Sequence, residues 1–226
     1  MLETDLVLFD LDGTLVDTAP DMANALNRVL TDQGEHELAL ATVRPHVSRG
    51  AAGLLALAFG HDLAPARHEA LREALLHHYR ADLARLSRPF PGMVALLDRL
   101  EARGVLWGVV TNKPAWLADP LLEQLDLARR CVCIVSGDTL AERKPAPAPL
   151  RHACTLAGAS AARSLYVGDD ERDVQAAHRA GMRVIVALFG YLGVDTTPAQ
   201  WGATGLIETP GELWAYLEHP GAAEVS

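Results

Sequence analysis

The stretch that decides how this chain is interpreted is LVLFDLDGTLV, residues 6–16. Its first four residues form a continuous apolar run, which is typical of a strand buried on both faces of a parallel sheet. Asp10 and Asp12 follow at once, and residues two apart project to the same side if strand geometry continues. The same letters also form two apolar runs around an Asp-Gly turn, the signal of a β-hairpin. Alone, this stretch leaves a catalytic strand end and a plain hairpin open.

Further apolar runs predict the rest of a sheet. We expect buried strands at residues 105–110, 132–135, 165–167 and 184–186, a weak strand at 206–207 and a short closing helix at 213–217. Leucines at helical spacing fill the intervals, for example over residues 93–100 and 117–125. Alternation of strand and helix predicts an α/β protein with a Rossmann-like parallel sheet covered on both faces.

Residues 19–86 break this alternation. Apolar residues keep helical spacing over residues 22–30 and 71–83, with an apolar stretch at 47–59 between them, and no strand-like run intervenes. We therefore predict two parts: a catalytic core of residues 1–17 and 87–226, and an inserted helical cap of residues 18–86. A cap inserted just after the first strand would overhang the sheet edge at which open α/β sheets bind ligands.

Composition excludes several classes of function. The chain has 226 residues, a formal net charge of −9 and only 5% aromatic residues, which disfavours a nucleic-acid binder. The start of the sequence is acidic where a signal peptide needs basic residues, and the longest mostly apolar stretch, Gly50–Gly60, is too short for a membrane span. The three cysteines match no metal-ligand spacing, so we expect them to serve as small hydrophobic residues: Cys131, Cys133 and Cys154. These features predict a cytoplasmic protein with no membrane role.

Four polar clusters follow predicted strands. They are Asp10-Leu-Asp12-Gly-Thr, Thr111-Asn112-Lys113-Pro, Lys144-Pro, and Gly-Asp169-Asp170-Glu-Arg-Asp173. Because the ends of parallel strands share one sheet edge, residues 10, 111, 144 and 169 are expected to converge. Singly, each cluster has a simpler explanation: a turn, a helix cap, an extended residue before proline, or acids at a helix start. Together, carboxylates, a hydroxyl, an amide and an ammonium are the groups that Mg²⁺-assisted phosphoryl transfer needs.

Each group has an expected task. Asp10 and Asp169 would supply carboxylates to Mg²⁺, and the main-chain carbonyl of Asp12 a third oxygen. Of Asp10 and Asp12, one could attack phosphorus while the other donates and later accepts a proton. Lys144 and Thr111 would neutralise and orient the phosphoryl oxygens. Only two of the 20 basic residues, Lys113 and Lys144, are lysine, which suggests that a compact ammonium is needed at both places.

With these motifs in order, the chain resembles the phosphatases of the haloacid dehalogenase superfamily, and among them the bacterial phosphoglycolate phosphatases. The resemblance implies that Asp10 is the nucleophile, Asp12 the general acid/base and Asp169 the metal carboxylate. It further implies that Thr111, Asn112 and Lys144 bind phosphate, and that Asp173 orients metal-bound water. Asp170 stands where relatives often have Ser; we expect a helix cap there.

The predicted cap contains Arg49-Gly50-Ala51-Ala52-Gly53, which resembles the family's specificity segment. Small residues would let this backbone approach the substrate, and Arg49 could bind a substrate carboxylate. A solvated arginine at a helix end is the equally open alternative for Arg49, and His46 has the same undecided status.

The predicted function is an Mg²⁺-dependent phosphomonoesterase for a small anionic metabolite, with 2-phosphoglycolate as the first candidate substrate on resemblance alone. The alternatives are a sugar phosphate such as N-acetylmuramic acid 6-phosphate, a mutase of the phosphoglucomutase type, and a non-catalytic binding protein. The mostly apolar stretch 47–59 disfavours the mutase, and the presence of Asp10 and Lys144 disfavours a non-catalytic protein. We expect a monomer or homodimer.

Overall fold

The computed structural model describes residues 4–193 and 196–218. Its main sheet has six parallel strands: β1 (Leu6–Phe9), β4 (Leu106–Val110), β5 (Ile134–Val135), β6 (Ser164–Gly168), β7 (Arg183–Ala187) and β8 (Gly205–Ile207). The strand order is β5-β4-β1-β6-β7-β8, so β1 lies between β4 and β6. The predicted α/β class and parallel sheet are confirmed.

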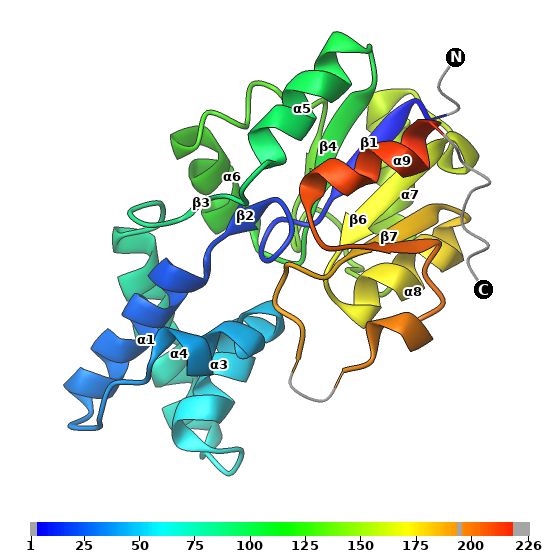
Figure 1. Ribbon diagram of the computed structural model, residues 1–226. Coiled ribbons are helices and arrows are strands. Elements are labelled where there is room, and N and C mark those ends of the chain that lie inside the picture. The colour runs from blue at the N-terminus through cyan, green and yellow to red at the C-terminus, as the bar shows by residue number, and fades with distance from the viewer. Residues whose placement is uncertain (1–3, 194–195, 219–226) are drawn as a thin grey trace.

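The residues of β1 explain its central position, because they alternate between two hydrophobic clusters. Val7 and Phe9 belong to the cluster that includes leucines of α5 (Met93–Ala102), α6 (Ala115–Gln124) and α9 (Leu213–Glu218). Leu6 and Leu8 belong to a second cluster with α7 (Ala148–Ala157) and α8 (Glu171–Ala180). Helices therefore cover both faces of the sheet (Figure 1).

Residues 18–86, which we call the helical insert, leave the core through a second, two-stranded sheet. There β2 (Val16–Asp17) pairs antiparallel with β3 (Arg88–Pro89), so the chain departs and returns side by side. Between them it forms α1 (Ala19–Asp32), α2 (Leu40–Val43), the 3-10 helix η1 (Arg44–Arg49), α3 (Gly50–Phe59) and α4 (Pro65–Ala81). Helices α1, α3 and α4 pack together beside the core (Figure 1). This all-helical course agrees with the predicted cap, whose domain boundaries remain a proposal.

The hairpin alternative for residues 6–16 is wrong. After β1 the chain turns at Gly13, which has a left-handed φ of 86°, and Val16 then pairs with Pro89 rather than with β1. A central strand such as β1 already has neighbours on both sides, so it has no free edge for a hairpin partner.

Two predicted strands are shorter than expected. The run 132–135 contributes only Ile134–Val135 to the sheet, and the strand predicted at 105–110 begins at Leu106.

Cys133 is buried in the second cluster, as expected if it serves as a small hydrophobic residue, and this burial raises the pKa of its thiol to about 12. The weak strand at 206–207 and the closing helix are confirmed as β8 and α9. No helix in the described part of the chain is long and apolar enough to cross a membrane.

Candidate active site

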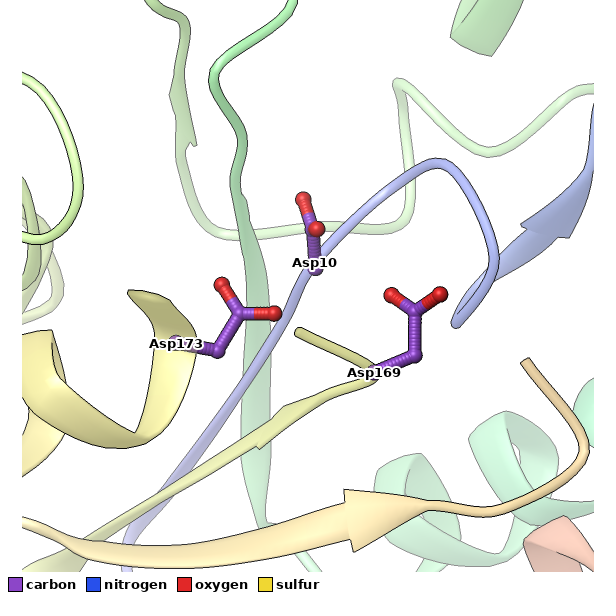
Figure 2. Close-up of side chains that lie close together, drawn as sticks. All are labelled: Asp10, Asp169 and Asp173. Carbon is purple, nitrogen blue, oxygen red and sulfur yellow. The ribbon is translucent and has the colours of Figure 1, made fainter. Parts of the chain in front are cut away.

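Three carboxylates meet at the ends of β1 and β6. Asp10 follows β1, Asp169 follows β6, and Asp173 lies in the first turn of α8. Each offers a carboxylate oxygen, and these oxygens all lie within 4.8 Å of one another. Figure 2 shows the three side chains around a common space. The predicted convergence of Asp10 and Asp169 is therefore observed, because β1 and β6 are neighbours in register.

Lys144 pairs with two of these carboxylates. Its Nζ lies 2.9 Å from Asp10 Oδ1 and 2.7 Å from Asp173 Oδ1, and it donates to the Tyr166 hydroxyl at 2.8 Å. Tyr166 in turn donates to the Val110 carbonyl at 2.8 Å. The Lys144 side chain is only 2% exposed, so its direction is set by these buried partners.

Asp169 is fixed by donors from three parts of the chain. Oδ2 accepts from the Tyr191 amide at 2.7 Å and from Ser48 Oγ of the helical insert at 3.1 Å, and Oδ1 accepts from Thr14 Oγ1 at 3.2 Å. Gly13 lies so close that a Cβ there would come within 2.2 Å of Asp169 Oδ2. Glycine at position 13 thus serves both the turn and the space around this carboxylate.

The charges in this group do not balance. Burial raises the pKa of Asp10 to about 6 against the opposing effect of Lys144, and burial together with Asp10 and Asp173 raises the pKa of Asp169 well above its usual range. Three carboxylates lie together and the Lys144 ammonium pairs with two of them, so an added cation would lower the cost of their ionisation. Hard oxygen donors at this spacing suit Mg²⁺, and Asp10 and Asp169 therefore fit the metal that the sequence predicts.

Asp12 takes a different direction from Asp10. Its Oδ1 accepts from Thr18 Oγ1 at 2.6 Å and from Lys113 Nζ at 3.0 Å, and Oδ2 lies 3.3 Å from the same ammonium. Its side chain is not one of the three grouped carboxylates. A metal contact by its main-chain carbonyl stays a prediction.

The predicted phosphate ligands Thr111 and Asn112 lie beside Lys144 after β4. Thr111 is buried and accepts from the Lys113 amide at 3.1 Å, and Asn112 Nδ2 donates to the Lys144 carbonyl at 3.0 Å. The Asn112 Oδ1 atom is buried without a hydrogen-bond partner among the residues described. All three side chains line one cavity, so the predicted neighbourhood is confirmed, whereas their roles remain predictions.

Asp170 caps α8, as predicted. It accepts from the Arg172 amide at 2.9 Å, and the Asp173 side chain accepts from the Asp170 amide at 3.2 Å, which completes a capping box. Asp170 also pairs with the Arg172 guanidinium, which donates to the Ser48 carbonyl at 2.8 Å. This cap therefore has a second effect, because it aims Arg172 at the helical insert.

The cavity between core and insert has a volume of about 660 Å³. Asp10, Asp12 and Lys144 line it from the core. Arg49 and Gly50 line it from the insert, which agrees with the prediction that this segment approaches the substrate. The insert also contributes side chains that the sequence analysis did not single out: His68, Glu69, Arg72, Leu76 and Tyr79. His46 is outside the described lining of this cavity, although its carbonyl lies under Gly53.

Comparison with known proteins agrees with this geometry. The model of the family described as haloacid dehalogenase-like hydrolase matches residues 7–187. The phosphoglycolate phosphatase of Xanthomonas campestris is 49% identical over 208 residues, covering 92% of this chain and 94% of that protein. The N-acetylmuramic acid 6-phosphate phosphatase of Pseudomonas aeruginosa is 40% identical over 212 residues, covering 94% of each.

Among solved structures, the crystal structure of a predicted phosphoglycolate phosphatase from Haemophilus somnus has a TM-score of 0.84 at 28% identity, covering 95% of this chain and 98% of that one. The fold, the order of motifs and these similarities agree, and the chain belongs to the haloacid dehalogenase-like hydrolase family.

Proposed function

We propose that this protein is a phosphoric monoester hydrolase that uses Mg²⁺ and forms an aspartyl-phosphate at Asp10. The observation that carries the proposal is that Asp10, Asp173 and Lys144 line one cavity, with the Asp169 carboxylate grouped beside those of Asp10 and Asp173. The names of both groups of relatives, phosphatases of phosphorylated metabolites, support the same reaction class.

Asp10 and Asp12 can together carry out the hydrolysis of a phosphate monoester in two steps. An oxygen of Asp10 forms a bond to phosphorus as the bond to the leaving oxygen breaks, and the electron pair stays on that oxygen. Asp12 gives the leaving oxygen a proton, which yields the alcohol. Asp12 then takes a proton from water as the water oxygen attacks phosphorus, and the bond to Asp10 breaks to release phosphate.

Lys144, Thr111 and the Asn112 amide would hold the phosphoryl oxygens during both steps, because stabilisation of charge dominates phosphoryl transfer. Asp10 and Asp169 would hold Mg²⁺, with Asp173 next to them; the ion would supply charge neutralisation at the phosphoryl group. Lys144 keeps Asp10 and Asp173 in place through its two ion pairs.

The first candidate substrate is 2-phosphoglycolate, supported by the names of the relatives that are 45–49% identical. Arg49 would bind its carboxylate, and Gly50 would allow the backbone to come close. A specific observation favours the second candidate, a sugar phosphate such as N-acetylmuramic acid 6-phosphate. A cavity of about 660 Å³ is of the size that holds drug-sized ligands and leaves a two-carbon substrate loosely surrounded.

Phosphate release from a panel of metabolites tests the proposal. The panel is 2-phosphoglycolate, N-acetylmuramic acid 6-phosphate, glucose 6-phosphate and glucose 1-phosphate, each with Mg²⁺ or with EDTA. We expect phosphate release with Mg²⁺ only, and its loss in Asp10→Asn, while the exposed-site control Asp98→Asn keeps full activity. Release that survives Asp10→Asn would refute the aspartyl-phosphate, and an isomerised hexose phosphate without free phosphate would indicate a mutase.

We further propose a cytoplasmic protein that acts as a monomer or homodimer on a small phosphorylated molecule, without nucleic-acid partners. The acidic composition and the lack of a membrane-spanning helix in the described residues support this setting.

A further inference from the structure

Lys113 is the other of the two lysines in the sequence, and it is buried at the active-site cavity. Its Nζ lies 3.0 and 3.3 Å from the two oxygens of Asp12 and donates to the Tyr79 hydroxyl at 3.0 Å. The ammonium also lies 4.5 Å from the centre of the Tyr79 ring. Lysine and tyrosine thus form one contact group with the Asp12 carboxylate.

The two lysines have separate partners. Lys144 pairs with Asp10 and Asp173, whereas Lys113 pairs with Asp12. Because the Lys113 ammonium contacts Asp12 and Tyr79, its charge acts most strongly on the Asp12 carboxylate. A compact ammonium fits between a carboxylate and an aromatic face better than the wider fork of arginine would.

Tyr79 brings the helical insert into this group. It belongs to α4, which packs on α1, whereas Lys113 and Asp12 follow strands of the core. The tyrosine is 1% exposed, and its position depends on the insert lying over the sheet edge. The orientation of Asp12 is therefore connected to the position of the insert through two hydrogen bonds.

We propose that Lys113 and Tyr79 are positioning residues: with the insert in place, they hold Asp12 in the direction needed for proton transfer to and from the reacting oxygens. The inference rests on the proposed function, since it explains how Asp12, the proposed acid/base, is held in position. It concerns Asp12 alone, and the attack by Asp10 does not depend on it.

The test uses a substrate that needs no proton for its first step. p-Nitrophenolate leaves without protonation, but the water that attacks the aspartyl-phosphate must still lose a proton. In Lys113→Met with p-nitrophenyl phosphate we expect a burst of about one equivalent of nitrophenolate per folded active site, then turnover slower by about 100-fold. Because only the second step is slowed, KM falls together with kcat, and kcat/KM stays within about threefold of wild type. Asp12→Asn should show the same burst, and rapid quenching with mass spectrometry should show the phosphorylated protein in both variants.

Tyr79→Phe removes only the hydroxyl, and with the same substrate we expect kcat to fall about fivefold while kcat/KM stays near wild type, in line with loss of one hydrogen bond. The matched control is Tyr216→Phe, which removes a phenolic hydroxyl that contacts the Leu206 carbonyl at the far side of the sheet. Melting temperatures of all variants separate lost folding from lost chemistry.

Three results would overturn the inference. A raised KM in Lys113→Met without a burst would make Lys113 a phosphate ligand. A lowered melting temperature with normal turnover per folded molecule would make it structural, and wild-type kcat in Tyr79→Phe would remove the link to the insert. If Asp12→Asn is itself fully active, the proposed acid/base role fails; if only the Lys113 and Tyr79 variants are normal, this inference alone fails.

Discussion

The environment of Asp10 and its proposed role favour different protonation states. Burial beside other acids favours the protonated carboxyl, whereas a nucleophile must be ionised. The pKa of Asp10 in the folded protein is raised to about 6 from the ordinary 3.8, with burial as the largest cause. Between about pH 4 and 6 the folded protein therefore binds more protons here than the unfolded chain does. Stability from this group is lost as the pH rises through that window, and the cost is complete above it.

A bound divalent cation would offset this cost, because it binds the ionised form. We therefore expect Mg²⁺ to raise the melting temperature more at about pH 7.5 than at about pH 5, where protons compete for the same oxygens. Thermal unfolding in Mg²⁺ and in EDTA at both pH values measures the difference. Asp10→Asn should abolish most of the shift at the higher pH, and equal shifts at both values would contradict the charge imbalance described above.

At the scale of elements, Asp21 joins the two ends of the helical insert. From the first turn of α1 it accepts hydrogen bonds from the Leu86 amide and from the amide and hydroxyl of Ser87, the last two at 2.7 Å. The carboxylate and Ser87 are buried, so removing the acceptor leaves two amides without partners.

We expect Asp21→Ala to lower the free energy of unfolding by about 3 kcal/mol, because charge-assisted bonds to buried donors are lost together. Urea unfolding measures this change. Asp98→Ala, which removes an exposed ion pair with Arg130, should change stability by no more than about 0.5 kcal/mol. Comparable losses in both variants would mean that Asp21 does not join these ends.

The sequence predicted the elements of the sheet better than their contacts with the insert. The run Leu6–Phe9 is apolar throughout and residues 165–167 form the apolar middle of β6, so their strand character is local information, and their pairing brings Asp10 and Asp169 together. The run 132–135 was overextended because Val132 is 40% exposed and lies before the strand. Hydrophobicity alone does not show where a run stops being buried.

Contacts across the cavity could not be predicted in the same way. Tyr79 shows helical spacing with Leu71 and Leu75, which indicates a buried face and nothing about Lys113. Ser48 reaches Asp169 only because η1 lies over the sheet edge, an arrangement that follows from packing between distant segments. For Lys113 the scarcity of lysine was the available signal; for the contacts of Tyr166 the sequence offered none.

At the scale of the whole molecule, Arg172 makes one of the polar contacts that join the insert to the core. Its guanidinium connects Asp170 of the core to the Ser48 carbonyl in η1. Arg172→Ala should lower kcat/KM about fivefold, as loss of about 1 kcal/mol would, through a less populated closed arrangement.

Steady-state kinetics on the best substrate of the panel measures this effect, with the Mg²⁺-dependent shift in melting temperature expected to persist. The control is Arg151→Ala, because Arg151 also donates to a main-chain carbonyl, that of Arg179, but away from the cavity. A variant of Arg172 with unchanged kcat/KM would show that the insert closes without this contact.

Burial of the only two lysines has a practical outcome for handling the protein. Their side chains are 6% and 2% exposed, so succinimidyl esters added to the native fold find both side-chain amines shielded, while unfolding uncovers them together. Labelling at these two lysines, followed over time by mass spectrometry of the digested protein, would then report global opening without an engineered probe.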